Sequence, residues 1–250
     1  DIKNLYFASI MDGIVDEANN RNLNIILGCS NENFKLQKKY IELFIEQRVK
    51  GIIIAVTQNS YDKINFFEQI SSKIPLVIDR KIDKQMPGVF FENFYSSYGV
   101  IEKFIKHGKK KIGFLAGPQT ISTAKERLDG YKKALKDNGI KYDKKLVLYG
   151  DFTLESGYNL GKEILKREIN AIYISNNSMT LGFLKALKEL SINPESMEIA
   201  TFEDNEIIRF IDEKIVSYDI PFSELAKKSI EILESLLKND ILDTTVEINL

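Results

Sequence analysis

Residues 1–7 read Asp-Ile-Lys-Asn-Leu-Tyr-Phe and lead directly into an amphipathic helical pattern at Tyr6–Arg21, with no strand before it. After this helix, short apolar runs alternate with helix-length stretches almost without a break as far as Leu250. A parallel α/β sheet of this kind should begin with a buried strand, and the chain starts just after the place where that strand belongs. We therefore expect the chain to be the remainder of a longer protein whose first strand lies upstream.

The expected strands are short runs of apolar or β-branched residues. They are Asn24–Cys29, Gly51–Val56, Pro75–Asp79, Val89–Phe91, Lys111–Ala116, Lys145–Tyr149, Ala171–Ser175, Glu198–Phe202, Ile215–Asp219 and Thr245–Asn249. The clearest expected helices, with apolar side chains at three- and four-residue spacing, are Tyr6–Arg21, Leu36–Arg48, Thr123–Asn138 and Phe222–Lys238. Continuously apolar strands joined by helices indicate parallel strands covered on both faces, so we predict a doubly wound α/β fold. Right-handed crossovers then place the loops after the strands along one edge of the sheet, where ligands bind.

The composition excludes several classes of protein. Lys and Arg number 35 and Asp and Glu 36, so the chain has no basic field for non-specific binding of nucleic acid. The longest apolar runs, such as Ile52–Val56, are far too short to cross a bilayer. The single cysteine, Cys29, rules out an internal disulfide and suits a reducing cytoplasm. With one histidine, His107, we expect neither a metal site nor a cofactor.

The common enzyme motifs are also absent from the sequence, which contains no G-x-G-x-x-G, G-x-S-x-G or H-E-x-x-H pattern. Gly157–Glu163 resembles a phosphate-binding loop, but it is one residue short and ends in Glu where Ser or Thr must hold the metal, so it favours a helix. We interpret Cys29 as a small core residue rather than a nucleophile. His107 precedes Gly108 and is typical of a helix cap. The sequence therefore predicts that the protein is not an enzyme.

Aromatic and planar polar side chains gather at the expected strand ends. They are Tyr6, Phe7, Asp79, Arg80, Glu92, Asn93, Phe152, Asn176, Asn177, Glu203 and Asp204, with Arg127 on a helix that follows a strand-end loop. Flat apolar faces cover C–H surfaces or stack on rings, while forked donors and acceptors pair with vicinal hydroxyls. This set is typical of a site for a polyhydroxylated or heteroaromatic small molecule.

Each of these residues also has an ordinary structural interpretation. Tyr6 and Phe7 could be core residues of their helix. Asp79-Arg80 could be a structural ion pair, and Asn176 could cap the helix that follows it. Arg127 could be a solvated helix residue, because periodicity alone does not place it inward.

Several fragments share the order and spacing of one protein family. They are residues 1–7, Gln47–Ile54, Pro75–Arg80, Lys111–Pro118, Arg127–Leu135, Gly150–Phe152 leading to Glu155–Tyr158, and Asn176 with Met179 and Leu181-Gly182. On these fragments the whole chain resembles the effector-binding core of the LacI/GalR family of bacterial transcription regulators.

The resemblance implies two doubly wound parallel-sheet lobes of the type I periplasmic-binding-protein kind, joined by three crossing strands, with a ligand in the cleft between them. We expect residues 1–108 with 220–238 in the N-terminal lobe and residues 109–219 with 239–250 in the C-terminal lobe. The resemblance also implies an upstream helix-turn-helix headpiece and a hinge helix, outside these 250 residues. Such proteins dimerise through this core, which places two recognition helices on a palindromic operator. Ligand binding changes lobe orientation and thereby operator affinity.

The resemblance implies a set of ligand-binding residues. Positions that commonly line the family's cleft correspond here to Tyr6, Phe7, Arg127, Phe152, Asn176 and Glu203, and more weakly to Asn4, Asp79, Arg80, Glu92 and Thr123. The family's Gly-Phe/Tyr-Asp-Asp appears as Thr201-Phe202-Glu203-Asp204, so Glu203 is one methylene longer than the usual acceptor. Purine-responsive members carry Arg after Gly-Pro where this chain has Ile121, which favours a neutral sugar over a purine or another anion.

We interpret the chain as the effector-sensing and dimerisation core of a cytoplasmic regulator, a repressor that responds to a sugar or sugar derivative. The alternative is an extracytoplasmic sugar-binding protein of a transporter, which shares the two-lobed fold. The family-like details at Gly117-Pro118 and Arg127–Tyr131 favour the regulator. The residues upstream of Asp1 discriminate between the two, because a helix-turn-helix indicates a regulator and a signal peptide indicates a transport protein.

These 250 residues should not retain operator DNA at physiological salt, because their charges balance and no recognition helix is present. The full-length protein should retain it. A gel-shift titration of both proteins on the same operator measures the difference. Equal retention would contradict the assignment of DNA binding to an upstream headpiece.

Overall fold

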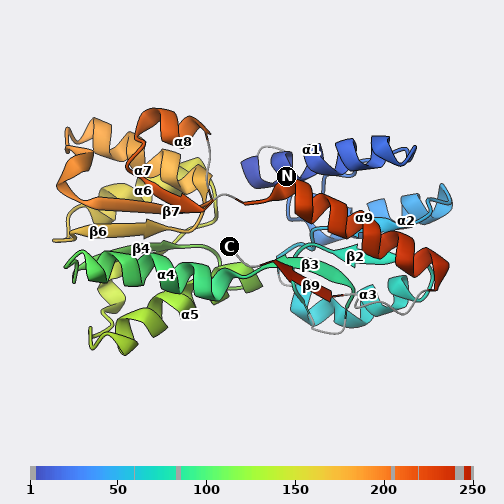
Figure 1. Cartoon of the computed structure of the whole chain (residues 1–250), viewed down its shortest axis with the longest axis horizontal. Coiled ribbons are helices and arrows are strands. Elements are labelled where there is room, and N and C mark those ends of the chain that lie inside the picture. Colours follow the sequence, from blue (N-terminus) through green and yellow to red (C-terminus); the bar gives the residue numbers. More distant parts are fainter. Residues whose placement is uncertain are drawn as a thin grey trace. The chain divides into compact units, whose positions relative to one another are not determined.

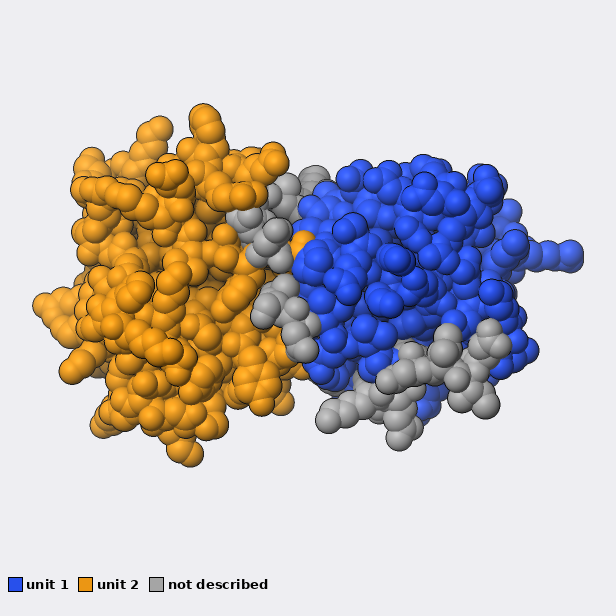
Figure 2. Space-filling model, viewed as in Figure 1, with its two compact units in different colours: residues 1–91, 221–249 blue, residues 92–220, 250 orange. Residues whose placement is uncertain are grey.

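The computed structural model describes residues 4–58, 60–82, 86–203, 206–218, 220–239 and 245–248. The chain divides into two compact units, each with one parallel sheet, as Figure 1 and Figure 2 show. Unit 1 comprises Asp1–Phe91 and Pro221–Asn249, and unit 2 comprises Glu92–Ile220 and Leu250. Two parallel sheets joined to helices confirm the predicted doubly wound α/β class.

Unit 1 contains a four-stranded sheet in the order β1-β2-β3-β9. Its strands are β1 (Ile52–Ile54), β2 (Leu76–Ile78), β3 (Gly88–Phe91) and β9 (Thr245–Ile248). Its helices are α1 (Leu5–Asn20), α2 (Phe34–Glu46), α3 (Ile64–Ser71) and α9 (Phe222–Lys238). Every residue of β2 and β3 is buried, which explains why these strands read as continuous apolar runs.

Unit 2 contains a five-stranded sheet in the order β5-β4-β6-β7-β8. Its strands are β4 (Ile112–Ala116), β5 (Val147–Tyr149), β6 (Ala171–Ile174), β7 (Glu198–Glu203) and β8 (Val216–Tyr218). Its helices are α4 (Asn93–Lys106), α5 (Ser122–Asp137), α6 (Leu154–Ile164), α7 (Asn177–Glu189) and α8 (Glu206–Ile211).

Stacked aromatic rings form the centre of unit 2. The ring of Phe114 on β4 lies between Tyr131 of α5 and Tyr173 of β6, with centroid separations of 5.1 and 5.0 Å. The Tyr131 hydroxyl donates to the carbonyl oxygen of Ile112 at 2.8 Å, and burial raises the pKa of that phenol. This packing attaches α5, and the loop before it, firmly to the sheet.

The two units divide differently from the predicted lobes. We expected α4 in the first lobe, because the boundary was predicted at residue 108, but α4 belongs to unit 2. It packs closely on α5: a Cβ at Gly130 would lie 2.2 Å from the carbonyl oxygen of Phe94. We also expected residues 239–250 in the second lobe, but β9 pairs with β3 in unit 1. The chain passes from unit 1 into unit 2 after Phe91 and returns to unit 1 after Ile220. These are two of the three expected connections between the lobes. The third falls on residues outside the described ranges.

One predicted strand is wrong. Asn24–Cys29 belongs to no sheet of the described residues, although the other nine expected strands form within three residues of their predicted ends. A strand exists only through hydrogen bonds to a neighbour. The described residues give this segment none, so its apolar side chains are not sufficient to make it part of the sheet.

No helix in the described part of the chain is both long and apolar enough to cross a membrane.

Candidate functional site

The guanidinium of Arg127 lies inside unit 2, at the carboxyl end of the sheet. Its Nε donates to Oδ1 of Asn93 at 2.9 Å, and its Nη1 donates to the carbonyl oxygen of Ser175. The guanidinium carbon lies 3.2 Å from the centroid of the Phe202 ring, a close cation–π contact. The residue is 8% exposed, so the interpretation of Arg127 as a solvated helix residue is wrong.

Glu203 ends β7 beside this guanidinium and is also buried. Its Oε1 accepts a hydrogen bond from the backbone N–H of Asn177 at 3.2 Å. Burial raises the pKa of Glu203, although the charge of Arg127 and the Asn177 N–H both favour the ionised form. Arg127 and Glu203 thus place one positive and one negative group close together inside unit 2.

Asn176 lies in the loop that follows β6, and Phe152 lies in the loop that follows β5. A hydrogen bond joins the two residues. The side chain of Asn176 caps α7, as the structural interpretation predicted, by accepting from the Met179 N–H at 3.1 Å. Its Nδ2 donates to the carbonyl oxygen of Phe152 at 3.1 Å. Phe152 has a φ of +68°, which is rare for an aromatic residue. Its ring lies against Gly117, where a Cβ would be 2.2 Å from the ring, so any larger residue at 117 would displace the Phe152 ring.

In unit 1, the start of α1 lies against the carboxyl end of β2. Asn4 caps α1 by accepting from the Tyr6 N–H at 3.1 Å. The Tyr6 hydroxyl donates to Oδ1 of Asp79 at 3.3 Å, and the Tyr6 ring contacts Phe7 and Phe222 edge-on. Burial raises the pKa of Asp79 to about 6, although Arg80 and the Tyr6 hydroxyl both lower it.

Arg80 forms its ion pair with Glu32. Its Nη2 lies 3.0 Å from Glu32 Oε1, and its Nη1 donates to the carbonyl oxygen of Val56 at 2.7 Å. The Glu32 carboxylate also accepts from the Gln58 N–H at 2.7 Å. The guanidinium lies 5.8 Å from the centroid of Phe7. Arg80 therefore joins the loops after β1 and β2 to the loop after Cys29.

The remaining predicted residues have structural roles in this chain. Glu92 caps α4 by accepting from the N–H groups of Tyr95 and Ser96. Thr123 is partly buried in the first turn of α5. His107 ends α4, and its Nδ1 lies 2.9 Å from Glu198. Gly157–Glu163 lies within α6, as expected for a helix rather than a phosphate loop. The expected Asp204 lies outside the described residues.

The structure brings Arg127, Phe152, Asn176 and Glu203 together in unit 2, and Asn4, Tyr6, Phe7, Asp79 and Arg80 together in unit 1. Sequence reasoning missed the roles of Phe202, Asn93 and Gly117. An apolar residue within a buried strand reads as core, so nothing in the sequence marked Phe202 as the surface on which Arg127 stacks. The described residues contain no cluster of three or more His, Cys, Asp and Glu side chains that could hold a metal ion.

Comparison with known proteins identifies the family. Residues 1–197 match the family described as periplasmic binding proteins and sugar binding domain of LacI family. The chain belongs to this family. It is 26% identical to the HTH-type transcriptional repressor PurR of Pasteurella multocida, over 91% of this chain and 70% of that protein. The crystal structure of the transcription regulator CcpA of Lactococcus lactis superposes with a TM-score of 0.90 at 26% identity, covering 99% of this chain and 92% of that one. A sugar-binding LacI-family regulator of Escherichia coli, crystallised with phosphate, has a TM-score of 0.81 at 26% identity, over 98% and 90% of the two chains.

Membership of the LacI family confirms the resemblance drawn from the sequence fragments. The relatives are transcription regulators, so the prediction that the chain is not an enzyme is confirmed. Contact between a ligand and the residues described above stays a prediction.

Asp79→Asn should remove a pH dependence of stability from unit 1. The folded state raises the pKa of Asp79 from 3.8 to about 6, so the folded chain binds this proton more tightly than the unfolded chain. The stabilisation that protonated Asp79 gives the folded state is complete below about pH 4 and is lost as the pH rises through about 6. Relative to the variant, the free energy of unfolding of the wild type should fall by about 2 kcal/mol between pH 4 and pH 7.

Urea denaturation across this pH range measures the difference, with Asp12→Asn on the exposed side of α1 as the control for a lost charge. Parallel pH profiles of wild type and Asp79→Asn would contradict the expectation.

Proposed function

We propose that this chain is the effector-sensing and dimerisation core of a bacterial transcriptional repressor that binds a small neutral sugar or sugar derivative. The proposal depends chiefly on the buried guanidinium of Arg127, held by Asn93 and Ser175 at the strand ends of a LacI-family sugar-binding domain. The family description supports a sugar, and the likeness to HTH-type transcriptional repressors supports a repressor.

The geometry of Arg127 favours recognition of hydroxyl pairs. A guanidinium carries five N–H donors in a planar fork, which matches two adjacent oxygen acceptors. Its hydrogen bonds to Asn93 and Ser175 and its stacking on Phe202 hold the fork in one orientation. Little conformational entropy is then lost when a ligand binds.

The balance of charge supports a neutral ligand. The buried carboxyl of Glu203 lies beside the guanidinium, so the positive charge of Arg127 is already opposed within the protein. Ile121, which stands where purine-responsive relatives carry Arg, is buried and apolar. An anionic ligand would therefore meet the Glu203 carboxyl beside the guanidinium.

Aromatic side chains supply the apolar part of the proposed site. Phe152 follows β5 in unit 2, and Tyr6 and Phe7 lie in the first turn of α1 in unit 1. Flat rings of this kind can cover the C–H face of a sugar. Asn176 fixes Phe152 through the hydrogen bond to its carbonyl oxygen. We propose that ligand contact with these residues is coupled to operator affinity.

The alternative function is an extracytoplasmic sugar-binding protein, because the family description includes periplasmic binding proteins. The relatives named above favour the repressor, since each is a transcription regulator aligned over at least 91% of this chain. A helix-turn-helix upstream of Asp1 would support the repressor, and a signal peptide there would support the transport protein.

Replacing Arg127 should weaken sugar binding sharply. Arg127→Lys keeps the charge but loses the planar fork, and the loss of a charge-assisted bond costs roughly 1.5–3 kcal/mol, which is about ten- to a hundredfold in affinity. Phe152→Ala should weaken binding comparably through lost burial and stacking. Isothermal titration calorimetry with a panel of neutral monosaccharides and disaccharides measures both effects.

Arg167→Ala, which removes an arginine paired with Glu163 on α6, is the matched control and should bind as the wild type does. Circular dichroism melts of each unliganded variant show that it is folded. Unchanged affinity of a folded Arg127→Lys variant for the sugar that binds the wild type would exclude the proposed site.

Self-association should depend on α8. Three apolar side chains of this helix are exposed: Phe210 at 92%, Ile211 at 51% and Ile207 at 50%. Such a patch is typical of an interface between protein chains, and an operator with two-fold symmetry requires a two-fold core. We expect a dimer at tens of micromolar by analytical ultracentrifugation.

Phe210→Glu should shift this equilibrium toward monomer without unfolding the chain, because the side chain has few contacts to lose. Tyr95→Glu, at a position 70% exposed on α4, is the control and should sediment as the wild type does. A monomeric wild type under these conditions would contradict the dimer.

A further inference from the structure

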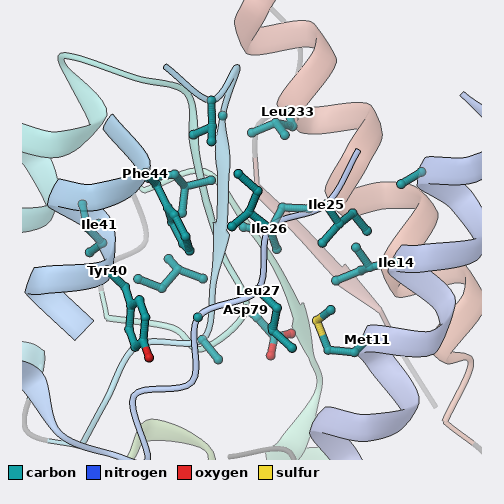
Figure 3. A pocket seen from close by; sticks show the side chains of 18 of the residues that line it. Met11, Ile14, Ile25, Ile26, Leu27, Tyr40, Ile41, Phe44, Asp79 and Leu233 are labelled. Carbon is teal, nitrogen blue, oxygen red and sulfur yellow. The ribbon is translucent and has the colours of Figure 1, made fainter. Parts of the chain in front are cut away.

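The interiors of the two units differ in how their polar groups are arranged. Figure 3 shows a groove of about 630 Å³ in unit 1, where Asp79 is the one labelled carboxylate among apolar and aromatic side chains. In unit 2, by contrast, buried polar side chains contact one another: Asn177 and Thr180 of α7, and Thr201 and Glu203 of β7. These contacts tie the start of α7 to the end of β7.

Thr180 and Thr201, which we call the threonine pair, have no exposed surface. A buried hydroxyl costs free energy unless it is hydrogen-bonded, whereas valine has nearly the same shape and needs no partner. Apolar packing alone would therefore be served as well by valine at both positions. The two hydroxyls require an explanation in terms of the groups that they contact.

The threonine pair passes a hydrogen bond toward Asn177. Thr180 Oγ1 lies 2.9 Å from Thr201 Oγ1 and 2.9 Å from the carbonyl oxygen of Asn176. That carbonyl oxygen already accepts the Thr180 N–H at 3.0 Å, so the one hydroxyl hydrogen of Thr180 can be donated to Thr201. Thr201 then donates its own hydrogen to Oδ1 of Asn177, at 3.4 Å. Both hydroxyl hydrogens have an acceptor in this arrangement.

Asn177 is thereby held by β7 at two points. Its side chain accepts from Thr201, and its backbone N–H donates to Oε1 of Glu203 at 3.2 Å. Thr201 and Glu203 are two residues apart on one strand, so their side chains project from the same face of the sheet. The first N–H groups of a helix have no partner within the helix, so the N–H of Asn177 depends on Glu203. Thr201, Asn177 and Glu203 form a closed set of contacts.

We propose that Thr201 is a positioning residue for the ligand site of unit 2: its hydroxyl fixes Asn177, and the N–H of Asn177 fixes the carboxyl of Glu203 toward one hydroxyl of the ligand. The inference rests on the proposed binding of a neutral sugar. A long glutamate side chain has several rotamers, and a carboxyl held in one of them loses less entropy when a ligand binds. A sugar that lacks the matching hydroxyl leaves this buried group without its partner, so the arrangement gives selectivity.

Thr201→Val keeps the shape of the side chain and removes its hydroxyl. Isothermal titration calorimetry should show affinity about three- to tenfold weaker for the sugar that binds the wild type, the effect of one lost neutral hydrogen bond. Thr201→Ser restores the hydroxyl and should recover most of the affinity. Ser235→Ala is the matched control: it removes a hydroxyl that donates to the Glu231 carbonyl oxygen within α9 of unit 1, and it should bind as the wild type does.

Selectivity separates positioning from a general loss of stability. Titration of Glu203→Gln with deoxy analogues of the sugar identifies the hydroxyl concerned, because this variant should no longer discriminate against the analogue that lacks it. Thr201→Val should discriminate less against the same analogue. A purely structural effect of Thr201→Val would weaken binding of the sugar and of the analogue by the same factor.

A measurement without ligand tests the contact itself. Amide hydrogen exchange followed by NMR should be about tenfold faster at Asn177 in Thr201→Val than in the wild type, with β6 unchanged. Equal exchange at Asn177, or unchanged affinity and selectivity in the folded Thr201→Val variant, would overturn the proposal. A wild type that binds none of the sugars would instead contradict the proposed function, and exchange at Asn177 would still decide whether Thr201 holds this residue.

Discussion

The central strands of each sheet are buried on both faces, so polar side chains gather where those strands end. All three residues of β2 and all five of β4 are buried. The polar groups come immediately after such strands, as Asp79 does after β2, or complete them, as Glu203 does for β7. In a parallel sheet these ends share one edge. The same constraint that makes the strands apolar therefore gathers the candidate ligand-binding residues of each unit.

This constraint also explains how much of the protein is predictable from sequence. Runs such as Ile112–Ala116 need no context to be recognised as buried strands, and Phe222–Lys238 was predicted with the bounds that the structure shows. The predictions that were wrong concern segments whose packing or pairing partners are distant in the sequence. The 24–29 segment has strand composition, but the described residues offer it no neighbour to pair with. Helix α4 belongs to unit 2, and Gly130 allows α5 to approach it closely.

The candidate site was predictable by residue type but not by orientation. Its aromatic and polar residues could be identified because they follow apolar runs. The inward direction of Arg127 depends on Asn93, Ser175 and Phe202, which come from three other places in the chain. Burial of a guanidinium beside a carboxyl usually contributes less to stability than apolar packing of the same volume. Such a pair at a strand end is better explained by what it can bind than by its contribution to folding.

The candidate residues of unit 1 are linked to one another by direct contacts. Between Asn4 and Phe7 the chain supplies the cap of α1, the Tyr6 hydroxyl on Asp79 and the Phe7 ring near Arg80. Arg80 in turn holds Glu32, in the loop after Cys29. A ligand that displaces Tyr6 or Phe7 would therefore also disturb Asp79 and Arg80, because each of these side chains contacts the next. The first turn of α1 thus connects the loop after β2 to the rest of the candidate site in unit 1.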